Sequence, residues 1–94
     1  MTKQDLVDRL ASGIGLAKPE VQAVVDGFMN LVVDAVASGE RVELRRFGIW
    51  KPVRRKGRRL TTPDGAREID LPDRTVAVFT PAAEFRERMQ ATHV

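Results

Sequence analysis

Apolar residues near the N-terminus recur at helical spacing. Leu6 and Leu10 fall on one helical face, because residues three or four apart are neighbours on a helix. Thr2 precedes this stretch, and Asp5 follows three residues later, which is typical of a capping box. We therefore predict a helix over residues 3–13 that ends at a glycine.

A second helical stretch is longer, and its apolar face is wider. It runs from Val21 to Val36, with Pro19 in its first turn and Gly39 at its end. A face this wide predicts either a helix buried in a core or a helix shared with a second subunit. The pattern alone leaves both interpretations open.

From Arg41 the apolar period changes to two, which predicts strands. Val42 and Leu44 alternate with charged residues, and Gly48 is interpreted as the turn between two short antiparallel strands. Pro52 cannot donate to a ladder, so we expect it at an edge of the sheet or where the strand leaves it.

A basic segment with almost no apolar side chains follows at residues 53–62. Pro63-Asp64-Gly65 is a turn signal, and residues 67–71 return to alternation. Two extended stretches that meet at such a turn predict a long, mostly solvated two-stranded ribbon. A ribbon of this kind is unstable alone, so a partner is expected to supply order.

After the ribbon, Pro72-Asp73 is expected to turn the chain, and residues 76–79 to form another strand. Thr80 is expected to cap a last helix with Pro81 in its first turn, and the tail, residues 91–94, to fray.

The predicted fold class is α+β within a single domain of 94 residues. A helical base covers about residues 1–40, a small antiparallel sheet with a protruding arm about 41–80, and a short C-terminal helix about 81–90.

Charge is distributed unevenly along the chain. Residues 45–67 hold nine Lys and Arg against one Asp, a net charge of +8. The other residues hold seven basic against twelve acidic side chains, a net of −5, although the whole chain carries only +3. This asymmetry points to a polyanionic partner, and duplex DNA fits a narrow basic ribbon.

Other chemistry is poorly supported. The chain has no cysteine, its only histidine is His93 near the C-terminus, and its acidic residues lack metal-ligand spacing. We therefore predict neither an enzyme, such as a hydrolase or nuclease, nor a cofactor or a metal site. The sequence shows no signal peptide or membrane span, which favours a cytoplasmic location.

Two other interpretations of the basic segment remain. It could be only a solvated face or a disordered loop, or it could dock an acidic protein surface. The single acid, the flanking strand-like stretches and the Pro-Gly turn favour a DNA-binding ribbon.

The chain resembles the bacterial HU / integration host factor family over about residues 1–90. The resemblance rests on Lys3 with Leu6-Val7, Gly39-Glu40-Arg41-Val42-Glu43-Leu44, Phe47-Gly48, Pro63, Ile69 with Pro72, and Phe79-Thr80-Pro81.

The resemblance implies an intertwined dimer with a helical base and two β-ribbon arms that embrace DNA in the minor groove. In this class of architectural protein, to which the family belongs, apolar wedges inserted between base pairs kink the duplex. Pro63 matches the wedge position, and the implied role is to bend DNA and so compact the nucleoid or assist DNA transactions.

Charge and resemblance together give two sets of candidate site residues. The DNA-binding set is Lys3, Arg45, Arg46, Arg54, Arg55, Lys56, Arg58, Arg59, Pro63, Arg67 and Arg86. The dimer-core set is Phe28, Val32, Leu44, Phe47, Trp50 and Phe79, whose aromatic members could otherwise stack on bases.

The chain departs from the family pattern at the tip. Family members usually carry Arg-Asn-Pro there, where this chain has Thr61-Thr62-Pro63. An alternative alignment makes Leu60 the wedge, but it needs compensating gaps, so Pro63 is preferred.

The sequence is compatible with two kinds of dimer. Glu43-x-Arg45 is more similar to the integration host factor β subunit than to HU, so either a homodimer or one subunit of a sequence-preferring heterodimer is compatible. RNA could be a secondary ligand, because phosphates dominate the affinity of such proteins.

Overall fold

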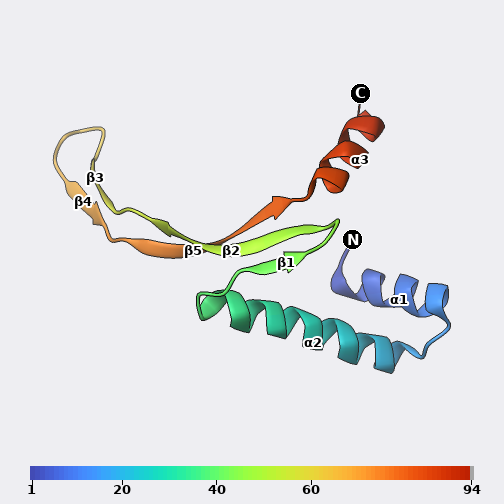
Figure 1. Ribbon diagram of the computed structural model, residues 1–94. Coiled ribbons are helices and arrows are strands. Elements are labelled where there is room, and N and C mark those ends of the chain that lie inside the picture. The colour runs from blue at the N-terminus through green and yellow to red at the C-terminus, as the bar shows by residue number, and fades with distance from the viewer. Residues whose placement is uncertain (94) are drawn as a thin grey trace. The chain divides into compact units, whose positions relative to one another are not determined.

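A computed structural model describes residues 1–93 of the chain (Figure 1). Over these residues the order of elements is α1 (Lys3–Ile14), α2 (Lys18–Ala37), β1 (Val42–Leu44), β2 (Gly48–Arg55), β3 (Arg58–Thr61), β4 (Glu68–Leu71), β5 (Arg74–Pro81) and α3 (Ala83–His93). The chain divides into two compact units, Met1–Asp34 and Ala35–Val94. Within the described range, no helix has both the length and the apolarity that a membrane crossing requires.

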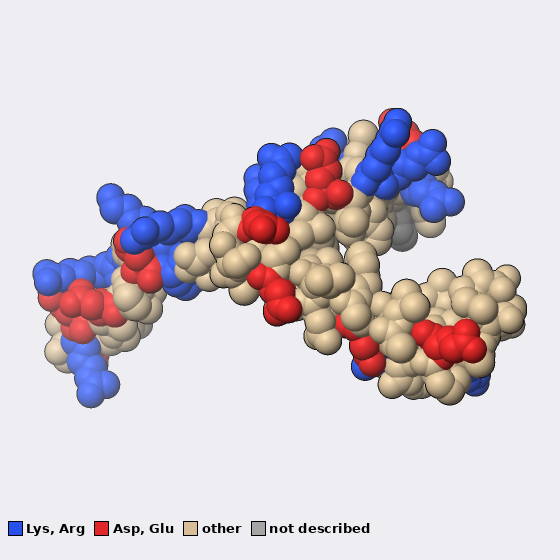
Figure 2. Space-filling model, turned by 60° about the horizontal axis from the view of Figure 1, so that its bottom comes forward, with Lys and Arg blue, Asp and Glu red and all other residues tan. Residues whose placement is uncertain are grey.

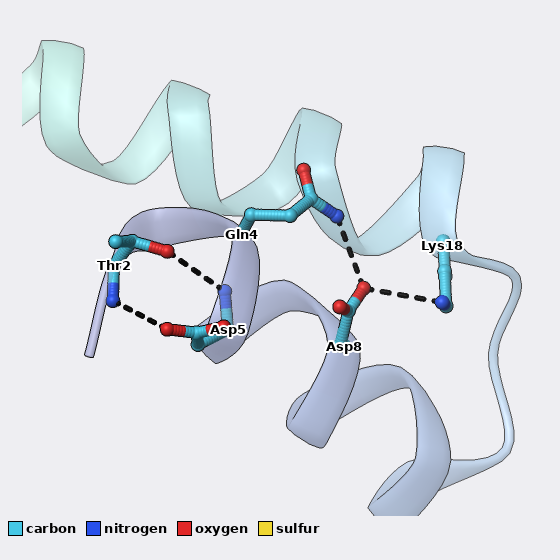
Figure 3. Close-up of polar contacts among 5 residues, drawn as sticks. All are labelled: Thr2, Gln4, Asp5, Asp8 and Lys18. Carbon is cyan, nitrogen blue, oxygen red and sulfur yellow. Dashed lines mark hydrogen bonds and ion pairs between the residues drawn. The ribbon is translucent and has the colours of Figure 1, made fainter.

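The first unit begins with the predicted capping box. The Thr2 hydroxyl oxygen accepts the Asp5 amide, and the Asp5 carboxylate accepts the Thr2 amide at 2.8 Å (Figure 3). Gly13 lies within the helix, and Gly15 ends it with a left-handed φ of 73°. The predicted helix is confirmed and extends one residue further, to Ile14.

A small apolar cluster joins the two helices of this unit. Val7 and Ala11 of α1 pack with Val21 of α2, and Val25 lies at the edge of the cluster. Only Val7 is fully buried among the larger side chains of the described residues. This core is too small to stabilise the unit by itself.

Polar contacts add to this cluster. Asp8 accepts a hydrogen bond from Gln4 and pairs with Lys18 at 3.2 Å, so that Gln4 first and Lys18 second lower the pKa of Asp8 (Figure 3). Lys3 pairs with Asp26 at 2.8 Å. These pairs are exposed, so each contributes little to stability.

The second unit contains a three-stranded antiparallel sheet in the order β1-β2-β5 and a two-stranded ladder of β3 and β4. At the centre of the sheet, Trp50 lies opposite Val42 of β1 and Phe79 of β5. β1 pairs with β2 only as far as Trp50, so Pro52 lies where β2 is paired on one side alone. The expectation that Pro52 occupies an open edge is confirmed.

The predicted turn at Gly48 is wrong by a few residues. The turn is formed by residues 45–47, with Arg46 at a φ of 72°, and Gly48 is the first residue of β2. A Cβ at Gly48 would lie 2.6 Å from both the Phe79 ring and the Thr80 carbonyl oxygen. Glycine is therefore needed here for close packing and not for a turn conformation.

The start of the C-terminal helix also differs from the prediction. Thr80 and Pro81 belong to β5, and α3 begins at Ala83. The sheet holds these residues, because Thr80 pairs with Ile49 and the Ala82 amide bonds the Phe47 carbonyl at 2.9 Å. The tail expected to fray is helical through His93, and Val94 lies outside the described residues.

Candidate nucleic-acid interface

The arm, defined here as residues 54–74, is the outer part of the ribbon that extends from the sheet (Figure 1). All four residues of β3 are exposed, as are three of the four residues of β4. The arm therefore has no core of its own, and its backbone ladder and polar contacts must maintain its shape. The predicted solvated ribbon is confirmed.

A junction joins the arm's outer ladder to the sheet. Pro72-Asp73 was expected to turn the chain, but β4 and β5 continue in one direction, and these two residues lie opposite Lys56-Gly57. The Asp73 carboxylate accepts the Gly57 amide at 2.6 Å and an Arg54 guanidinium N–H at 3.1 Å. These bonds, that of Gly57 first, lower the pKa of Asp73.

The same junction requires a glycine on the opposite strand. A Cβ at Gly57 would overlap the carbonyl oxygen of Leu71. The two strands thus approach closely where the ladder is interrupted, and Asp73 bridges the interruption.

The tip is a turn between Thr62 and Arg67 with its own hydrogen bonds. The Thr62 amide bonds the Arg67 carbonyl at 2.9 Å, and Gly65, at a φ of 71°, donates to the Thr62 carbonyl at 2.8 Å. Asp64 accepts the Thr62 hydroxyl at 2.5 Å and the Ala66 amide at 3.1 Å, and these bonds lower its pKa. Pro63 lies within this turn, at the end of the arm.

The outer ladder has two different faces. Directly opposed residues of an antiparallel pair share a face, and the faces alternate along each strand. One face, the ion-pair face, holds Arg59 opposite Asp70 and Thr61 opposite Glu68. The other, the acid-free face, holds Arg58 opposite Leu71 and Leu60 opposite Ile69.

The strand register places acidic residues of β4 opposite the basic strand β3. Arg59 pairs with Asp70 at 2.9 Å and with Glu68 at 3.8 Å. The arm, residues 54–74, holds seven basic and four acidic side chains, a net of +3. The window 45–67 gave +8 because it includes Arg45, Arg46 and Lys51 and stops before Glu68, Asp70 and Asp73. Figure 2 shows acidic and basic groups mixed at the outer end of the ribbon.

The predicted DNA-binding cations fall into two groups. Lys3, Arg46, Arg54 and Arg59 form ion pairs, with Asp26, Glu84, Asp73 and the β4 acids respectively. The second group has no ion-pair partner among residues 1–93 and consists of Arg45, Arg55, Lys56, Arg58, Arg67 and Arg86.

Sequence reasoning missed one cation of the arm, Arg74. It lies outside the basic segment, and only the strand register places it opposite Arg55. Like charges directly opposite each other repel, so a bound anion would stabilise this pair. Alternation in the sequence predicts the strands but not their register, so it could not show that Arg74 lies opposite Arg55.

An aromatic cluster lies at the inner end of the ribbon. Phe79 packs against Trp50, Phe47 and Phe85, with ring centroids 4.9, 5.2 and 6.1 Å apart. Phe85 was not among the predicted core residues, because a single aromatic on a short polar helix gives little signal. The cluster supports the interpretation of these rings as packing residues.

The predicted dimer-core residues are incompletely covered within one chain. Phe28 is 49% exposed and Phe47 48% exposed, and the other four, Val32, Leu44, Trp50 and Phe79, are half-buried. Beside Phe47 a pocket of about 510 Å³ is lined by Phe85 and Met89, with Arg46, Arg88 and Thr92 completing it. This apolar surface is available to a further protein chain.

Comparison with known proteins agrees with this geometry. The family model described as "Bacterial DNA-binding protein" matches residues 1–90. The chain belongs to this bacterial DNA-binding family. The predicted membership of the HU / integration host factor family is therefore confirmed, and the family is one of architectural DNA-binding proteins and not of enzymes.

Relatives within the family include both HU proteins and integration host factor subunits. The chain is 30% identical to the DNA-binding protein HU of Thermotoga maritima over 90 residues, 96% of this chain and 100% of that one. It is 34% identical to the integration host factor subunit alpha of Xanthomonas campestris, over 97% of this chain and 92% of that one.

Among solved structures, the chain is similar to that of HU in an Anabaena HU–DNA cocrystal. The TM-score is 0.87 at 30% identity, covering 95% of this chain and 97% of that one. The predicted α+β fold of helical base, small sheet, ribbon arm and C-terminal helix is confirmed as that of the HU family.

Proposed function

We propose that this HU-family chain binds the minor groove of duplex DNA and bends the duplex as a dimer, with the acid-free face of each arm toward the DNA. The observation that carries the proposal is the segregation of acids on the outer ladder. Glu68 and Asp70 share the ion-pair face, so the opposite face presents no carboxylate to phosphates.

The chemistry of the acid-free face fits a groove. Leu60 is 37% exposed and Ile69 46% exposed, so the two offer apolar surface to sugars and base edges. Arg58 lies on the same face, and Arg55 with Arg74 lies at the junction, where phosphates would relieve their repulsion. The neighbouring Lys56 and Arg67 add cations, while Arg59 serves chiefly to neutralise the acids.

The tip supports Pro63 as the wedge. Its ring is rigid and apolar, and it lies in the turn beyond the last ladder pair, Thr61 with Glu68. Leu60, the alternative wedge, lies opposite Ile69 within the ladder, so its side chain projects from a face of the ribbon and not from its end. We therefore assign insertion to Pro63 and groove contact to Leu60.

Dimerisation follows from the small amount of burial in one chain. Among the described residues only Val7, Ala11, Val21 and Val36 form buried apolar positions. Among the large apolar side chains, Phe28 stays 49% exposed and Leu31 71% exposed. A chain of this size with so little core is marginal alone, and a second copy would complete one domain from both chains.

Four of the predicted DNA-binding cations lie outside the arm. Arg45, Arg46 and Arg86 lie on the sheet-bearing unit, and Lys3 starts α1. We infer that they contact phosphates of a duplex bent around the base. On this proposal the protein associates with the nucleoid.

Salt dependence tests DNA binding. Each neutralised phosphate contributes about −0.9 to the slope of log K against log salt, so a dimer with several contacts gives a steep line. The measurement is a gel shift or anisotropy titration on a short duplex, with single-stranded RNA as the competitor. A flat line would contradict the proposal and favour an acidic protein partner.

Bending is tested with Pro63→Ala. We expect the variant to lose most of the bend measured by energy transfer on an intact duplex, while it keeps its affinity for a duplex already kinked by a gap. Leu60→Ala is the matched control and should keep the bend. Equal losses of bend and of gapped-duplex affinity would contradict the wedge role.

The dimer is tested by dilution. A dimer that unfolds to monomers melts at a lower temperature as the protein is diluted. Melting independent of concentration, with a monomer mass by light scattering, would contradict it. Light scattering of the pure chain also separates a homodimer from a chain that needs a different subunit.

A further inference from the structure

A carboxylate lies beside the residue to which we assign insertion. Asp64 follows Pro63 directly, so their Cα atoms are about 3.8 Å apart and both move with the tip. An acid here is unexpected in a protein that binds a polyanion. It is also distinct from the arm's other acids, because Glu68, Asp70 and Asp73 are paired with arginines.

The Asp64 side chain has a defined position. It accepts the Thr62 hydroxyl at 2.5 Å and the Ala66 amide at 3.1 Å. These hydrogen bonds, that of Thr62 first, lower the pKa of Asp64, so the group is ionised at neutral pH. An ionised carboxylate can accept about four hydrogen bonds, which leaves an acceptor position for a donor outside the protein.

The minor groove offers such a donor at only one kind of base pair. Both A·T and T·A present the acceptors N3 and O2 there, whereas G·C adds the N2 amino group of guanine. A carboxylate at the groove floor would accept from that amino group. At A·T it would face only acceptors, and in A-tracts also an enhanced negative potential.

We propose that Asp64 is a specificity-determining residue, which makes the tip favour G·C over A·T base pairs at the step where it inserts. The inference rests on the proposed function, because it requires Pro63 to enter from the minor groove. The Asp64 carboxylate contributes in two ways. Its hydrogen bond strengthens binding at G·C, and the same charge, left unpaired, weakens binding at A·T.

The test uses four duplexes that share one gap, which fixes the position of the kink. They differ in the base pair beside the gap: G·C, inosine·C, A·T or 2-aminoadenine·T. Inosine removes the minor-groove amino group from G without altering the major groove, and 2-aminoadenine adds it to A. We expect about tenfold tighter binding to each amino-bearing duplex than to its partner without the group.

Variants assign this preference to the carboxylate. Asp64→Ala should bring both ratios close to one, and its affinity for the A·T duplex should rise. Asp64→Asn keeps the size of the side chain. Its Oδ1 already accepts the Thr62 hydroxyl and the Ala66 amide, so an N–H group replaces the free carboxylate oxygen, and the preference for the amino-bearing duplexes should be lost. Asp70→Asn changes the net charge equally on the ion-pair face and should keep the full preference.

The outcomes separate the two proposals. Equal affinity for all four duplexes, with bending intact, would overturn the role of Asp64 and leave the proposed function standing. A preference that survives in Asp64→Ala would also overturn it, because another group would then read the amino group. Absence of bending on every duplex would overturn the proposed function and this inference with it.

Discussion

The inner and outer parts of the ribbon share one backbone geometry but are held together differently. Both are antiparallel, and each contains a glycine, Gly48 or Gly57, at which a Cβ would collide with the facing strand. The inner part packs four aromatic rings, whereas the outer part is exposed and relies on polar contacts. The inner part therefore provides stability, and the outer part is left available for a ligand.

The largest effect is expected at the inner glycine. Gly48→Ala places a methyl group 2.6 Å from the Phe79 ring and the Thr80 carbonyl, so the sheet or the ring must shift. We expect a loss of about 3 kcal/mol in the free energy of unfolding, measured by urea denaturation.

Gly13→Ala is the matched control for that substitution. A Cβ at Gly13 meets nothing within 4 Å, and alanine favours a helix interior, so stability should be unchanged or rise by up to about 1 kcal/mol. Equal destabilisation by both variants would show that close packing at Gly48 is not the reason for its glycine.

The outer glycine should give a smaller and local effect. Gly57→Ala should open the junction, because its Cβ overlaps the Leu71 carbonyl. We expect amide exchange in β3 and β4 to accelerate by roughly tenfold, while the melting temperature of the protein stays nearly unchanged. A fall in melting temperature as large as that of Gly48→Ala would contradict the separation into two parts.

Substitution of two neighbouring arginines tests which face of the outer ladder contacts DNA. Arg58→Ala should weaken DNA binding and reduce the salt slope by about one unit per arm, because Arg58 lies on the acid-free face. Arg59→Ala should change the slope less, because Arg59 already pairs with Asp70 and Glu68. Equal slopes for both variants would contradict the assignment of the DNA-facing side.

The smallest expected effect is a pH dependence of the junction. The pKa of Asp73 is lowered below 3.8 by the Gly57 amide and then by Arg54. Its contribution is therefore complete above pH 3.8 and is lost as the pH falls through the lowered pKa. The Gly57 amide shift in NMR should follow this titration, and Asp73→Asn should abolish it. A titration centred above 3.8 would contradict the contact.

Local signals in the sequence predicted much of this fold. The Thr2 capping box, the wide apolar face of residues 21–36 and the Pro63-Asp64-Gly65 turn all act within a few residues, and the structure contains each of them. The resemblance to the HU family added the topology that short-range patterns cannot give.

The errors arose where distant residues decide the conformation. The residues around Thr80 predict a helix cap, but pairing with Ile49 keeps Thr80 in β5. Gly48 was predicted to form a turn, but a glycine is needed there because the Phe79 ring leaves no room for a Cβ. Within the candidate site, the charge of a sequence window omitted the acids that register places opposite it, such as Asp70.

The junction at Gly57 and Asp73 has a consequence for how such proteins diversify. It interrupts the ladder between the pair Arg55–Arg74 and the pair Arg58–Leu71, with two residues on each strand. Besides the two continuous strands, the contacts of Asp73 with Gly57 and Arg54 and one close backbone approach hold the outer hairpin to the sheet. Exchange of residues 58–71 between relatives should transplant the recognition properties of one arm onto the base of another.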